Sequence, residues 1–135
     1  MGYDIKMISS KFRIKSSNFA EAMRVMKELP EEHYAYVDDN YRQYGTLPAI
    51  LDGWGWIAMI DKESGDIIDI ALQGGDGELF GYSKLGDEYT LFSTIAPFVE
   101  SGSYIEVMGE DRDIRWEFEN NKLEVTESDY KGIED

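Results

Sequence analysis

The chain has 135 residues, of which 42% are hydrophobic and 13% aromatic, and this composition predicts one folded domain that needs no metal or disulfide to form its core. Cysteine is absent, which excludes thiolate chemistry and covalent cross-links. The net charge of −15 is the sum of −18 over residues 31–135, where 25 acidic side chains stand against 7 basic ones, and +3 over residues 1–30. This charge excludes ordinary nucleic-acid binding by the larger part of the surface and disfavours docking on an anionic membrane.

The N-terminal part of the chain predicts two strands and a helix. Apolar and polar residues alternate between residues 3 and 15 on both sides of Ser9-Ser10, which indicates two short strands. An amphipathic helix follows, because apolar residues recur at helical spacing up to Pro30, which ends it. Asn18 and Glu21 stand three residues apart, as in a capping box at the start of this helix.

The middle of the chain predicts a hairpin after a stretch with few signals. Residues 31–53 indicate only a helical turn at 47–51, which Pro48 can begin. Two β-like runs, 54–60 and 67–72, then flank a polar turn, so we expect a hairpin with Gly65 at its tight position. The glycines among residues 73–81 predict a loop there.

The C-terminal part predicts a second helix and a meander. This helix begins near Asp87 and is limited by Pro97. Three strands follow at 103–108, 114–118 and 123–126, with turns at 109–113 and 119–121 and a frayed acidic tail at about 127–135. Together the elements predict an α+β fold, in which a single domain of residues 1–135 has an antiparallel sheet with two main helices packed on it.

Two blocks of sequence resemble a known group of proteins. The first is Gly2-Tyr-Asp-Ile-Lys with the helix that follows, and the second runs from Ile95-Ala-Pro-Phe-Val through Gly-Ser-Tyr-Ile-Glu and Gly-Glu-Asp to Trp116 and Phe118. Both are similar to small uncharacterised proteins encoded by bacteriophages and prophages. The resemblance covers about half of the chain and implies a mobile-element gene expressed in a bacterial cytoplasm. It implies no activity and no site residues.

No constellation of residues predicts an enzyme, a metal site or a cofactor. His33 is the only imidazole, and no Gly-x-Ser-x-Gly turn supplies a serine for it. Glu110, Asp111 and Asp113 cluster in a predicted turn beside two arginines, where we interpret them as a solvated acidic rim. Because no apolar run is long enough to cross a bilayer, we expect a soluble cytoplasmic protein.

Aromatic residues offer a second candidate surface. Trp54 and Trp56 are two residues apart and would share one face of a strand, with Tyr41 and Tyr44 earlier in the chain. Residues of these types dominate protein-binding hot spots, but the same residues can equally form the sheet core. The sequence leaves both interpretations open.

The sequence therefore favours a non-catalytic protein that binds a protein partner with a basic surface. One hypothesis is a phage-encoded inhibitor whose carboxylates, including Glu110, Asp111 and Asp113, mimic nucleic acid and occupy a host or defence enzyme. The alternative is an adaptor or immunity-type module that binds through Trp54, Trp56, Tyr41 and Tyr44. An enzyme is the third and least favoured hypothesis. The oligomeric state stays open.

Overall fold

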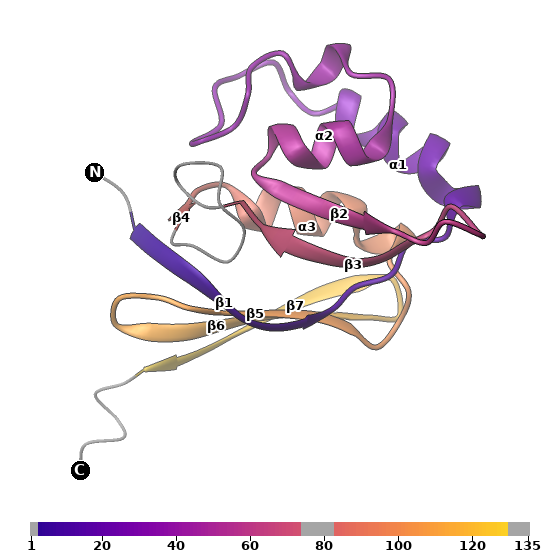
Figure 1. Ribbon diagram of the computed structural model, residues 1–135. Coiled ribbons are helices and arrows are strands. Elements are labelled where there is room, and N and C mark those ends of the chain that lie inside the picture. Colours follow the sequence, from indigo (N-terminus) through magenta and orange to yellow (C-terminus); the bar gives the residue numbers. More distant parts are fainter. Residues whose placement is uncertain (1–2, 74–82, 130–135) are drawn as a thin grey trace.

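The computed structural model describes residues 3–73 and 83–129 and has the predicted α+β architecture (Figure 1). The strands are β1 (Tyr3–Lys11), β2 (Trp56–Ile60), β3 (Ile67–Leu72), β4 (Ser83–Leu85), β5 (Ser103–Met108), β6 (Arg112–Glu119) and β7 (Lys122–Asp129). The helices are α1 (Phe19–Lys27), α2 (Leu47–Gly53) and α3 (Glu88–Ile95), with 3-10 turns at Ser16–Asn18, Tyr41–Gln43 and Ala96–Phe98. The predicted antiparallel sheet is confirmed, and α2 adds a third helix to the two expected.

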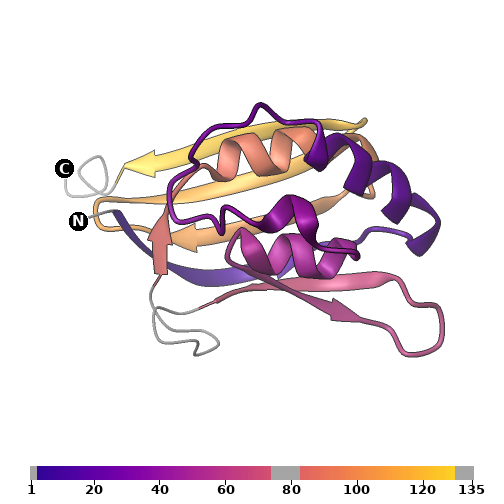
Figure 2. The same cartoon turned by 90° about the horizontal axis from the view of Figure 1, so that it is seen from above.

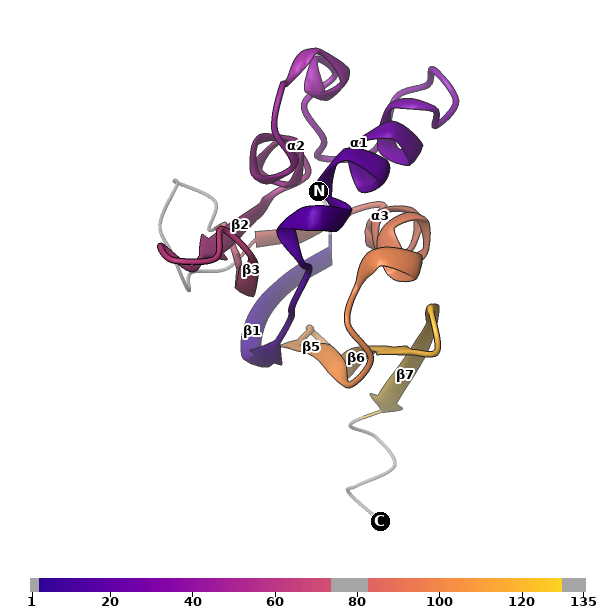
Figure 3. The same cartoon turned by 90° about the vertical axis from the view of Figure 1, so that its right-hand side faces the viewer.

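The elements form a main sheet with the helices on one side of it. Five antiparallel strands follow the order β4-β1-β5-β6-β7, and β2 and β3 form a separate hairpin. Figure 2 and Figure 3 show the three helices over one face of this sheet, with the hairpin beside β1. Ile14 joins the parts, because it bridges Ile67 of β3 and Val99 after α3. The hydroxyl of Ser10 also donates to the carboxylate of Asp69 at 2.7 Å.

The first strand differs from its prediction. Residues 3–11 form one strand, and the register against β5 shifts between Met7 and Ser9. The extra residue, Ile8, forms a bulge that moves the alternation of inward and outward side chains by one position. This interruption of the pattern is what made Ser9-Ser10 look like a turn between two strands.

The helix boundaries follow local chemistry, with one correction. The helix ending before Pro30 is confirmed as α1, but Asn18 makes no side-chain cap. Asn18 already belongs to a 3-10 turn and has helical φ and ψ angles, whereas a capping side chain usually needs an extended backbone. At α2 such a cap forms: the backbone of Thr46 is extended, and its hydroxyl accepts from the N–H of Ala49 at 3.2 Å. The predicted turn at 47–51 is thereby confirmed and extended.

The C-terminal meander is confirmed, with longer strands than expected. Asn120 and Asn121 both have positive φ angles, 52° and 66°, so they form the two-residue turn that joins β6 and β7. The turn after β5 is shorter than predicted, because Arg112 and Asp113 already belong to β6. Residues 127–129 pair with β6 and are not a frayed tail. Residues 130–135 and 74–82, most of the predicted glycine-rich loop, lie outside the described part of the chain.

Aromatic rings form the centre of the core between the sheet and the helices. Trp56 meets Phe92 of α3 at a ring-centroid distance of 5.2 Å and Trp116 of β6 at 6.2 Å, both edge to face. Phe12 and Phe118 extend the cluster. The predicted hairpin of β2 and β3 carries Trp56 into this cluster, and Gly65 closes its turn with a φ angle of 78°. Within residues 3–73 and 83–129, no helix combines the length and apolar character needed to span a bilayer.

Candidate functional site: an acidic surface on the helical layer

The aromatic residues predicted as a binding surface lie mostly in the core. Trp54, Trp56 and Tyr41 are each at most 2% exposed. Trp54 does not share a strand face with Trp56, because it ends α2 and is separated from β2 by Gly55, whose φ angle is +93°. The ring of Tyr41 packs edge to face on Trp54 at 5.3 Å. The core interpretation therefore holds for these three residues, and the exposed aromatic face of the adaptor hypothesis is wrong.

Tyr44, the fourth aromatic residue of that prediction, is half-buried and orders an acidic loop. Its hydroxyl donates to the carboxylate of Asp38 in a short hydrogen bond. This bond, followed by one from the N–H of Asn40, lowers the pKa of Asp38 below its usual value. The same contact raises the pKa of Tyr44. Asp38 therefore carries its negative charge over the whole neutral range, in a loop of defined shape.

The structure places the acidic side chains of the predicted turn after β5 close together, but arginines offset part of their negative charge. Glu110 accepts the N–H of Asp4 at 2.8 Å and so links this turn to β1. Arg112 donates to Asp111 at 2.9 Å and to Glu127 at 2.6 Å, and these bonds raise the pKa of its guanidinium well above the usual value. Asp113 lies within β6, opposite Met108 and Ser128.

The outer face of the sheet next to this turn is also of mixed charge. Arg115 lies between Glu106 at 3.3 Å and Glu117 at 3.2 Å, and its guanidinium stacks 4.0 Å above the ring of Tyr104. Each of these exposed pairs contributes little to stability. Their importance is electrostatic, because positive charges among the carboxylates make this face a poor copy of a phosphate backbone.

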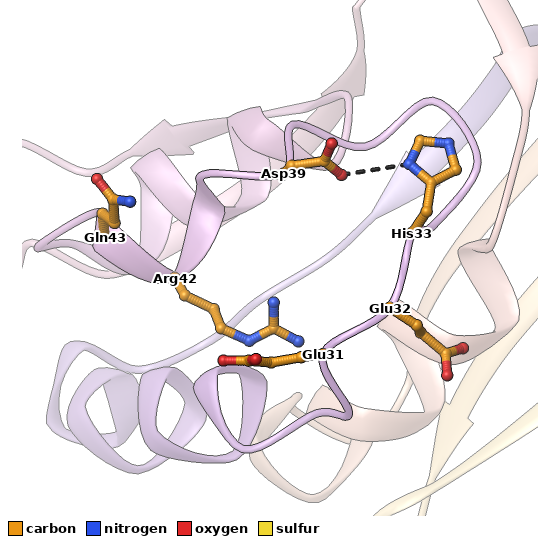
Figure 4. A pocket seen from close by; sticks show the side chains of 6 residues that line it. All are labelled: Glu31, Glu32, His33, Asp39, Arg42 and Gln43. Carbon is orange, nitrogen blue, oxygen red and sulfur yellow. Dashed lines mark hydrogen bonds and ion pairs between the residues drawn. The ribbon is translucent and has the colours of Figure 1, made fainter.

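A second acidic surface lies on the segment that shows the fewest structural signals in the sequence. Between residues 28 and 61 the chain holds seven acidic side chains and one basic one, Arg42. There an open hollow of about 550 Å³ is lined by Glu31, Glu32, His33, Asp39, Arg42 and Gln43 (Figure 4). The imidazole of His33 contacts the carboxylate of Asp39 at 3.3 Å.

The only arginine of this segment is held by the backbone. One guanidinium nitrogen of Arg42 donates to the carbonyl oxygens of Leu29 at 2.8 Å and Pro30 at 2.6 Å, and so ties this segment to the chain that follows α1. The hydroxyl of Tyr34 also donates to the Pro30 carbonyl, at 3.0 Å. These bonds fix the hollow, whose lining residues lie in loops and in the 3-10 turn Tyr41–Gln43. Glu31 and Glu32 are adjacent in sequence, but only the fold adds Asp39, which is why sequence reasoning missed the site.

A buried carboxyl that the sequence did not indicate lies at the start of α3. Glu88 is 6% exposed, and its two oxygens accept from the N–H of Gly86 at 2.6 Å and from the indole N–H of Trp56 at 3.3 Å. Burial raises the pKa of this carboxyl, although both hydrogen bonds act in the opposite direction. In sequence, an acidic residue in the first turn of a helix looks like an ordinary solvated one.

This raised pKa predicts a specific pH dependence. Below the usual value of 4.5, Glu88 is protonated in both states and its contribution is fully present; the contribution is lost as pH rises through the higher folded-state pKa. The difference in free energy of unfolding between wild type and Glu88→Gln should therefore fall as the pH rises above 4.5. Urea unfolding at several pH values measures it. Glu63→Gln, which changes an exposed carboxyl, is the control, and a pH-independent difference for Glu88→Gln would contradict the prediction.

Comparisons with known proteins add no assignment. No protein family model, no curated protein and no solved structure matches the chain. In the part of the chain that the structure describes, no three or more His, Cys, Asp or Glu side chains are grouped so that they can hold a metal ion.

Proposed function

We propose that this chain is a non-catalytic protein of a phage or related mobile element, which acts in the cytoplasm of a bacterial host. It binds a host or defence protein that has a basic, nucleic-acid-binding surface, and it occupies that surface as an acidic mimic. The observation that carries this proposal is the hollow of Figure 4, which Glu31, Glu32 and Asp39 line together with a single arginine, Arg42, whose guanidinium donates to backbone carbonyls. A lysine or arginine of the partner fits this hollow.

The physical argument rests on charge density and order. Carboxylates on an ordered surface can take the places of phosphates and attract a basic protein over a distance of about one Debye length. The segment that carries them is fixed at several points. The N–H of Ala35 donates to Asp87 at 2.8 Å, and the N–H of Asp38 donates to the Gly53 carbonyl at 2.8 Å. An ordered surface loses less conformational entropy on binding than a flexible one.

Affinity capture from a bacterial lysate, with washes of rising salt, tests the proposal. The wild type should retain a basic nucleic-acid-binding protein, which moderate salt or added duplex DNA releases. The triple variant Glu31→Gln, Glu32→Gln, Asp39→Asn should bind that purified protein about tenfold more weakly for each carboxylate that contacts a cation. Its control, Glu63→Gln, Glu100→Gln, Glu119→Gln, removes the same number of exposed charges elsewhere.

The comparison between variants decides between a site and bulk charge. Equal weakening by both triple variants would mean that only the net charge matters, and the hollow would lose its role. A third variant, Glu110→Gln, Asp111→Asn, Asp113→Asn, tests the surface that the sequence predicted, and we expect a smaller effect because Arg112 offsets it. A partner that survives high salt and ignores added DNA would contradict mimicry of nucleic acid.

A further inference from the structure

The last strand of the main sheet has an open edge. Within the described residues β7 pairs with β6 on one side only. On the other side of the sheet, β4 pairs with the first residues of β1, and further along the chain Ser10 binds Asp69 of β3 and Ile14 bridges Ile67. An edge strand presents a row of N–H and C=O groups that can pair with an added strand. With eight residues, β7 is long enough for such pairing.

A groove runs beside this edge on the inner face of the sheet. It consists of two adjoining hollows of about 190 and 140 Å³ that share Leu85, Ile114 and Glu127. Tyr89, at the start of α3, lines the second hollow and is 63% exposed. Val125 lies on the same face of β7 as Glu127 and is 39% exposed. Apolar surface is therefore available at the open edge.

The outer face of β7 carries the negative charge of Glu124 beside another carboxylate. Glu124 lies directly opposite Glu117 of β6, and like charges in this position repel. Glu117 is paired with Arg115 at 3.2 Å, whereas no described cation lies within ion-pair distance of Glu124. A cation on a sixth strand, opposite Glu124, would relieve this repulsion. A second copy of the chain does not supply it: two-fold antiparallel pairing centred on residue 124, 125 or 126 places Glu124, Thr126 or Ser128 opposite Glu124, and none of these is a cation.

We propose that the edge of β7 binds an extended segment of another protein as a sixth strand. Side chains of the segment alternate between the two faces of the sheet. A lysine or arginine on the outer face contacts Glu124, and an apolar side chain on the inner face packs beside Val125 and Tyr89. This surface is separate from the acidic hollow and does not depend on it.

Titration of the isotope-labelled full chain with a synthetic peptide, acetyl-Thr-Val-Lys-Val-Lys-Val-Thr-amide, followed by NMR, tests this proposal. Saturable shifts of the amides of residues 122–129 and of Tyr89 are expected. Glu124→Lys should weaken binding about fivefold, the scale of one cross-strand charge pair, and should strengthen binding of the peptide with Glu in place of Lys. The matched control Glu63→Lys should bind as the wild type does.

Three results would overturn the proposal. One is equal binding of a peptide whose central Val is replaced by proline, since proline cannot complete the strand ladder. Another is shifts that map to residues 31–43, or loss of binding in the variant Glu31→Gln, Glu32→Gln, Asp39→Asn, since the peptide would then be a ligand of the hollow. The third is concentration-dependent dimerisation that protects the β7 amides. Failure of the lysate capture leaves these outcomes unaffected, so the two proposals fail separately.

Discussion

Replacing Trp56 with alanine is expected to lower the free energy of unfolding by about 3–5 kcal/mol, the cost of removing a large buried aromatic side chain. Trp56 is fully buried and packs against rings from α3 and β6. Its loss opens a cavity between β2, α3 and β6. It also removes the indole donor from the buried carboxyl of Glu88. Urea unfolding followed by far-UV circular dichroism measures the change.

Trp56→Phe separates the two contributions. Phenylalanine keeps much of the ring packing but removes the indole N–H, so the expected cost is about 1–3 kcal/mol, the range for a buried acceptor that loses its donor. The phenylalanine variant should regain part of this loss at low pH, where the Glu88 carboxyl is protonated and its desolvation costs less. If Trp56→Ala cost less than about 1 kcal/mol, the aromatic cluster would not be the centre of the core.

Gly86→Ala is expected to destabilise the protein by about 1–3 kcal/mol or more, because the position has no room for a side chain. A Cβ atom there would lie 2.3 Å from the carbonyl oxygen of Ala35 and 3.1 Å from its carbonyl carbon. Neither the backbone of Gly86 nor that of Ala35 can move away without straining a hydrogen bond. The N–H of Gly86 donates to Glu88 at 2.6 Å, and the N–H of Ala35 donates to Asp87 at 2.8 Å.

This substitution also links stability to the acidic hollow. The residues that must move away from Gly86 belong to the loop that carries the hollow, so partner binding by Gly86→Ala should weaken even at temperatures where the variant is folded. Gly45→Ala is the control, because no atom lies within 4 Å of its Cβ and its φ angle is not positive. We expect it to change the free energy of unfolding by less than about 1 kcal/mol. Similar losses for both glycines would contradict the steric explanation.

Much of the fold follows from local patterns. The periodicity of α1, the turn at Gly65 and the alternation in β5, β6 and β7 each depend on neighbours in the sequence, and each prediction is confirmed. The predictions are wrong where a single residue interrupts the regular alternation of a strand. The bulge at Ile8 shifts the pattern of β1, and the positive φ angle of Gly55 turns Trp54 away from the strand that carries Trp56.

The candidate site was less accessible to sequence reasoning for a different reason. The charged residues can be counted in the sequence, but the contacts that offset their charges depend on the fold. Strand pairing places Arg112 beside Glu127 and Arg115 beside Glu106, and Arg42 binds the carbonyl groups of Leu29 and Pro30 just after α1. The burial of Glu88 depends in the same way on the approach of Trp56, which lies 32 positions earlier.

The position of β1 inside the sheet has a consequence for how the chain reaches its fold. β1 is synthesised well before β5, yet the two strands are neighbours in the sheet, and Lys6 pairs with Met108. Until β5 emerges, β1 has no partner on that side, and Ile5 and Phe12 have no complete core to enter. Pairings so distant in sequence slow the search for the native state. The main sheet therefore cannot form before β5 has been synthesised. Until then the nascent chain exposes apolar surface, to which a chaperone can bind.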